Sequence, residues 1–138
     1  MLDRAVLIAA QAHLGQKDRV GAPYILHPLR MMLRFNAQTE MIVAVLHDVV
    51  EDNPDWNFDR LRQEGFSEEI IQAVDHLTRR EQESYEEFVD RTSQNELARR
   101  VKLADLEDNM NLTRLKSLSG NDKKRLERYH RAWVKLSS

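Results

Sequence analysis

Residues 41–52 read MIVAVLHDVVED, an apolar run that ends in a group of polar side chains. The first six residues of this stretch predict a buried helix. A helix turns by about 100° per residue, so His47 and Glu51 are expected on one line of its surface, as are Asp48 and Asp52. Such groups are costly to bury unless something compensates them, and a divalent cation does so. The stretch therefore predicts a metal-binding or proton-transferring helix end, with a solvated structural end as the alternative.

The rest of the chain also has helical patterning. Apolar residues recur at helical spacing, and no segment alternates as a β-strand would. The length of 138 residues suits one domain with one core. We therefore expect an all-α fold in which a single domain of about seven to eight helices occupies 1–138. The segments are about 3–14, 26–35, 39–51, 57–64, 67–77, 84–92, 95–110 and 121–136, the last starting at Asn121 or Asp122.

The composition excludes several classes of site and partner. There is no cysteine, so disulfides, thiolate zinc sites and cysteine nucleophiles are absent. The formal net charge of −2 gives no general attraction to nucleic acid or to an anionic membrane. The apolar runs are too short to span a membrane. We expect a cytoplasmic protein that binds neither nucleic acid nor a membrane and is a monomer or a small homo-oligomer.

A second polar cluster lies in the segment 95–110. Asp105 and Asn109 are four residues apart and share a helix face. Upstream, His27 stands beside a proline just after a loop that contains glycine and proline. A site made of His27, His47, Asp48 and Asp105 would combine nitrogen and oxygen ligands, a set that suits manganese, iron or zinc better than calcium.

This order of residues matches the HD-domain metallophosphohydrolases, which are named after an adjacent His-Asp pair. The flanking motifs make the match more specific, because they occur in the same order. Over nearly its whole length the chain resembles the hydrolase domain of the RelA/SpoT alarmone enzymes. It is also similar in length to the stand-alone small alarmone hydrolases, so we expect no synthetase or regulatory domain. The motifs are AHLGQ (12–16), GAPYILHP (21–28), LHDVVED (46–52) and VKLAD (101–105) with Asn109 and Met110.

The resemblance implies a metal-dependent enzyme that removes the 3′-diphosphate from (p)ppGpp and leaves GDP or GTP and pyrophosphate. It implies one divalent ion, expected to be manganese, on His27, His47, Asp48 and Asp105. It further implies that Glu51 and Asp52 are the catalytic acids, without dividing their roles, and that Asn109 contacts the water or the ribose–phosphate region. The expected substrate-binding residues are Lys17, Arg19, Tyr24, Arg79, Arg125 and Tyr129, although a solvated or core position is the alternative for each.

The chain departs from the resembled family at two positions. The family commonly has an arginine and a lysine where this chain has Asp18 and Arg19, and the arginine stacks on guanine. Asp108 adds a negative charge where relatives often have an aromatic residue or histidine. Both changes leave open an adenine alarmone, (p)ppApp, or the 2′-phosphate of NADPH as substrate. A general HD-type nucleotidase and a catalytically silent alarmone sensor are the remaining alternatives.

Overall fold

The computed structural model describes residues 1–138 and contains nine α-helices, one 3₁₀ helix and no strand, which confirms the all-α prediction. No helix combines the length and the apolar character needed to cross a membrane. The elements are α1 (Leu2–Ala12), α2 (Leu26–Met32), α3 (Gln38–Leu46), α4 (Val49–Asp52), α5 (Phe58–Gln63), α6 (Glu68–His76), α7 (Tyr85–Ser93), α8 (Glu96–Asn109), η1 (Leu112–Arg114) and α9 (Gly120–Ser137).

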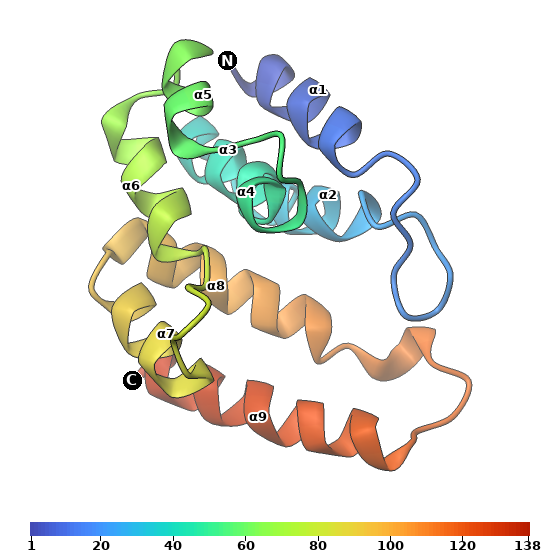
Figure 1. Ribbon diagram of the computed structural model, residues 1–138. Coiled ribbons are helices and arrows are strands. Elements are labelled where there is room, and N and C mark those ends of the chain that lie inside the picture. The colour runs from blue at the N-terminus through green and yellow to red at the C-terminus, as the bar shows by residue number, and fades with distance from the viewer.

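Helix α3 is the centre of the larger core. It is surrounded by α1, α2, α6 and α8 (Figure 1), and its residues Ile42 to Leu46 are buried. A helix that is apolar on all sides is stable only inside the protein, so the predicted burial of this segment is confirmed. The chain leaves the core at the C-terminal end of α3, so the residues after Leu46 lie next to α2 and α8.

Helix α8 joins this core to a second, smaller one. It packs against α2 on one side and α9 on the other (Figure 1), and Val89 and Leu106 are buried with Ala132 and Leu136. Helices α7, α8 and α9 therefore form one wall of the fold, and the loop between α1 and α2 lies opposite α9.

Side-chain caps mark the starts of five of the nine α-helices. Asn57, Ser67 and Asn95 accept hydrogen bonds from backbone N–H groups of α5, α6 and α8, and Ser84 with Glu87 forms a capping box at the start of α7. The predicted start of the last helix was wrong: Ser119 is the N-cap, and Asp122 completes its capping box.

The expected continuous helix through residues 39–51 was also wrong, because it breaks at His47 and Asp48. Asp48 has φ −105° and ψ 0°, outside the helical region, and α4 starts after it. The His47 ring donates from Nδ1 to the Ala44 carbonyl at 2.7 Å, while the His47 backbone nitrogen lies 3.5 Å from the same oxygen. A side chain that competes for a backbone acceptor in this way weakens the helical ladder.

Candidate functional site

His47 follows the last residue of α3, and only one of its two ring nitrogens makes a hydrogen bond. Since the Ala44 carbonyl can only accept, Nδ1 carries the proton that it donates. Nε2 is buried and has no hydrogen-bond partner. It lies 2.9 Å from Oδ2 of Asp48 and 3.6 Å from Oδ1 of Asp105. A buried lone pair that faces two carboxylates is the arrangement expected of a metal ligand.

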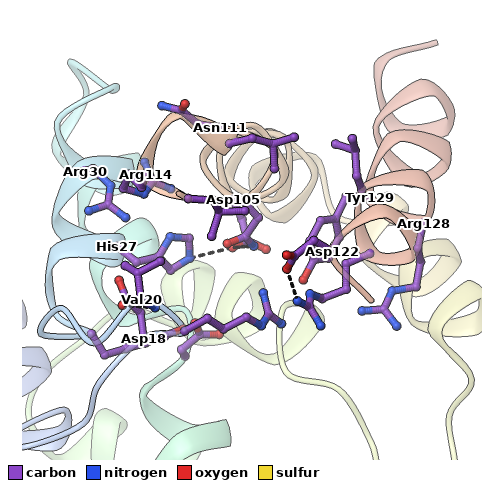
Figure 2. A pocket seen from close by; sticks show the side chains of 18 of the residues that line it. Asp18, Val20, His27, Arg30, Asp105, Asn111, Arg114, Asp122, Arg128 and Tyr129 are labelled. Atoms are coloured by element: carbon purple, nitrogen blue, oxygen red, sulfur yellow. Dashed lines mark hydrogen bonds and ion pairs between the residues drawn. The ribbon is translucent and has the colours of Figure 1, made fainter. Parts of the chain in front are cut away.

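His27, in the first turn of α2, lies between two carboxylates of α8. Its Nε2 is 2.8 Å from Oδ1 of Asp105, and its Nδ1 is 2.6 Å from Oδ2 of Asp108. Burial alone would lower the pKa of His27, but the hydrogen bonds to Asp105 and Asp108 outweigh burial and raise it. Figure 2 shows the His27 ring directed at Asp105.

Asp48 lies at the junction between α3 and α4 and accepts a hydrogen bond from the hydroxyl of Tyr24. Burial would raise the pKa of Asp48, but its contact with His47 and the nearby His27 together outweigh burial and lower it. Tyr24, predicted to bind substrate, therefore orients a candidate ligand, although it also lines the cleft described below.

The four predicted metal ligands come together from three separate parts of the chain. One ligand atom from each of His27, His47 and Asp48 lies within 4.8 Å of the others. Asp105 closes the group through its contacts with both histidines. Asn109 donates from its amide to Oδ1 of Asp105 at 3.2 Å, so it holds this carboxylate in place. The group matches a mixed nitrogen and oxygen metal site.

Two residues of α8 that the sequence analysis did not assign to the site support its ligands. Asp108 is buried and accepts two hydrogen bonds from Arg30, at 2.9 and 3.0 Å, besides its contact with His27. The positive charge of Arg30 therefore offsets the repulsion that Asp108 was expected to exert on an anionic substrate. Lys102 is also buried, and its Nζ lies 2.7 Å from Oδ2 of Asp105. Both residues are three positions from Asp105, a spacing that could have revealed them.

The two predicted catalytic acids lie in different surroundings. Glu51 lines the cleft, and its Oε1 accepts from the backbone N–H of Arg79 at 2.9 Å. Asp52 does not line the cleft, and its Oδ2 accepts from Nε2 of Gln16 at 3.0 Å. Neighbouring protein atoms remove part of the hydration of each carboxylate, and this raises the pKa of both.

A cleft of about 450 Å³ opens beside these groups. The loop that carries Lys17 and Arg19 forms part of its rim, and α9 forms the opposite side. All six predicted substrate-binding residues line it, although their roles remain predictions. Asp18 accepts from the backbone N–H groups of Val20 and Ala22, at 3.0 and 2.9 Å, so this acid shapes the loop. Eight basic side chains line the cleft: Lys17, Arg19, Arg30, Arg79, Lys102, Arg114, Arg125 and Arg128.

Comparison with known proteins finds relatives that are named as (p)ppGpp hydrolases. No protein-family model matches the chain. It is 29% identical, over 79% of its length, to a guanosine-3′,5′-bis(diphosphate) 3′-pyrophosphohydrolase of Aquifex aeolicus, of which it covers 17%. It is 36% identical over 55% of its length to the enzyme of that name from Borreliella burgdorferi, and 35% identical over 55% to the bifunctional (p)ppGpp synthase/hydrolase SpoT of Escherichia coli. It covers 12% of each of these two proteins. The chain is therefore similar to one segment of proteins that are named as (p)ppGpp hydrolases, and it spans less than a fifth of their length.

Proposed function

We propose that this protein is a metal-dependent phosphohydrolase that removes the 3′-diphosphate from a nucleotide alarmone of the (p)ppGpp type. The observation that carries this proposal is the buried, unpartnered Nε2 of His47, which faces Asp48 and Asp105 beside a cleft lined with basic side chains. The names of the three relatives support the same reaction and the same substrate class. Under this proposal the products from (p)ppGpp are GDP or GTP and pyrophosphate.

The metal, which we propose to be manganese, would be held by His27, His47, Asp48 and Asp105. The donor set fits such an ion, since two imidazole nitrogens and two carboxylates meet there and one nitrogen lacks any other partner. A divalent ion at this place would lower the pKa of a water molecule and offset charge on the attacked phosphate. Asp108 and Asn109 would orient His27 and Asp105, respectively.

Glu51 is the better placed of the two acids to take a proton from the attacking water. Its carboxylate lines the cleft, and its raised pKa brings it nearer to neutral pH, which improves a general base. Asp52 is held by Gln16, outside the lining of the cleft. We therefore assign proton abstraction to Glu51 and a supporting electrostatic role to Asp52.

The base of the substrate remains open between guanine and adenine. Asp18 is engaged with the backbone of its own loop, so it does not replace the arginine of the resembled family. Lys17 and Arg19 stand on either side of it, line the cleft and form no ion pair with an acid. Arg19 is thus the candidate to contact a base or a phosphate from this rim.

The test is to strip the protein of metal, reload it with manganese, and incubate it separately with ppGpp, ppApp and NADPH. Anion-exchange chromatography then resolves the products. We expect pyrophosphate from at least one alarmone, and loss of this product in the His47→Ala variant. His130→Ala is the matched control, because His130 is exposed on α9 and does not line the cleft. Release of phosphate from NADPH alone, or no product at all, would contradict the proposed substrate.

A further inference from the structure

The basic side chains of the cleft divide into two groups by their partners. Four are paired with acids of the protein: Arg30 and Arg114 with Asp108, Lys102 with Asp105, and Arg125 with Asp122. The other four, Lys17, Arg19, Arg79 and Arg128, line the cleft without an acidic partner. A cation with no counter-charge in the fold is free to bind the charge of a ligand, and Arg128 is the one of these that α9 contributes.

Two aromatic rings hold the guanidinium group of Arg128. Its central carbon lies 4.8 Å from the ring centroid of Tyr85 and 5.4 Å from that of Tyr129. Arg79 approaches the same Tyr85 ring, with its guanidinium carbon 6.0 Å from the centroid. Two cations therefore flank one tyrosine, and contact with aromatic faces stabilises each of them in place without neutralising it.

Polar atoms in this corner of the cleft lack hydrogen-bond partners. The Tyr85 hydroxyl and Nε of Arg128 are both buried, and neither makes a hydrogen bond within the protein. Burial raises the pKa of Tyr85, so its hydroxyl keeps its proton and can donate. Buried donors are normally satisfied in folded proteins, and a pair left unsatisfied in the wall of a cleft indicates the place of a ligand group.

We propose that Tyr85 and Arg128 form a phosphate-binding subsite, which takes a phosphate group of the substrate other than the one attacked. The inference rests on the proposed function, because it assumes that the cleft binds a nucleotide with phosphates at two positions. The Tyr85 hydroxyl and the Arg128 guanidinium both donate to phosphate oxygens, and Arg79 adds a positive charge.

Arg128 lies on a different side of the cleft from the proposed metal ligand His27 (Figure 2). Figure 2 shows His27 on one side of Asp105, whereas Arg128 and Tyr129 extend from α9 on the other. A nucleotide whose 3′-diphosphate lies against His27 and Asp105 would reach α9 with its remaining phosphates. The subsite would therefore select nucleotides that carry phosphate at the 5′ position as well as at the 3′ position.

The first test measures binding without catalysis. GDP is titrated calorimetrically into the full chain in the presence of EDTA, so that neither turnover nor a metal–GDP complex contributes. We expect the dissociation constant to rise about tenfold in Arg128→Leu and severalfold in Tyr85→Phe, because each loses donors to a charged group. Arg131→Leu is the matched control, since Arg131 is exposed on the same helix and does not line the cleft.

Thermal unfolding separates binding from stability in this test. Tyr85→Phe removes only a hydroxyl that has no partner in the fold, so its Tm should equal or exceed that of the parent protein. A lower Tm together with unchanged affinity for GDP would show a structural role and overturn the inference. Unchanged GDP affinity in both variants, or no GDP binding by the parent protein, would also overturn it. If only Arg128→Leu weakens the binding of GDP, Tyr85 is not part of the subsite.

A kinetic test addresses selectivity. With manganese-loaded protein, Arg128→Leu should raise the KM for ppGpp about tenfold and leave unchanged the KM for guanosine 3′-diphosphate with a free 5′-hydroxyl. Equal changes for the two nucleotides would contradict the subsite. If the parent protein hydrolyses neither nucleotide, the proposed function fails, while the GDP titration still decides whether Tyr85 and Arg128 bind phosphate.

Discussion

Oδ2 of Asp108 lies 2.6 Å from Nδ1 of His27, so that a carboxylate of α8 orients a histidine of α2. The contact directs the other ring nitrogen, Nε2, toward Asp105. Carboxylates that orient metal-binding histidines in this way fix the ring and raise its basicity. The sequence alone suggests that Asp108 is unfavourable for an anionic substrate. In the structure it instead supports a histidine of the proposed metal site.

Asp108→Asn should weaken metal binding about 10- to 100-fold, because His27 loses the charge that orients and polarises its ring. The dissociation constant for Mn²⁺, measured by calorimetry, checks this. Glu107→Gln is the matched control: Glu107 precedes Asp108 on α8 but pairs with Arg34 and with Nε1 of Trp133. Equal affinities of Asp108→Asn and the parent protein would contradict the supporting role.

The affinity for metal should also depend on pH. Hydrogen bonds to Asp105 and Asp108 raise the pKa of His27, so its ring holds two protons to a higher pH than a free histidine does. A proton on Nε2 competes with the metal, and binding should therefore weaken as pH falls through this raised pKa. Titrations with Mn²⁺ between about pH 6 and about pH 9 should give a midpoint above the ordinary value of 6.5. An affinity that does not change over this range would contradict proton competition.

The helices could be predicted because their determinants are local. Apolar spacing identifies the segments, and the caps at Asn57, Ser67, Ser84 and Asn95 depend on residues within one turn. The break at Asp48 could not be predicted from spacing, because it involves competition between the His47 ring and the backbone for one carbonyl. Periodicity contains no signal for such competition.

The residues of the candidate site that belong to sequence motifs could be predicted, whereas those that join it only through the packing of helices could not. The adjacent pair His47 and Asp48 is visible in the sequence, whereas Asp108 joins the site only because α8 packs against α2. That contact spans 81 positions of the chain, from His27 to Asp108. Glu51 and Asp52 are neighbours in α4 and point in different directions, and only Glu51 lines the cleft.

This difference in position predicts unequal effects of the two acids on turnover. Glu51→Gln should lower kcat by about 10²- to 10⁴-fold, because a general base is lost, whereas Asp52→Asn should cost clearly less. The comparison is made with manganese-loaded variants at equal metal occupancy. Glu69→Gln, an exposed change on α6, is the control. A larger loss in Asp52→Asn than in Glu51→Gln would reverse the assigned roles.

The pair formed by Glu83 and Arg91 should stabilise the loop that presents Arg79 to Glu51. Glu83 accepts from Nε of Arg91 at 2.7 Å, and Arg91 also donates to the Thr78 carbonyl at 2.7 Å. We expect Glu83→Gln to lower the free energy of unfolding by about 1 kcal/mol at neutral pH. Urea unfolding measures this, with exposed Glu86→Gln as the matched control on α7.

The pH dependence of this stabilisation follows from the pKa of Glu83. Hydrogen bonds from Arg91 lower that pKa to about 2, from an ordinary value of 4.5. A lowered pKa in the folded state contributes stability that is complete above the unfolded-state value and is lost as pH falls toward the folded-state value. The stability difference between the parent protein and Glu83→Gln should therefore be constant near neutral pH and shrink below about pH 4.5. A difference that persists undiminished down to about pH 2 would assign the effect of Glu83 to packing rather than to its charge.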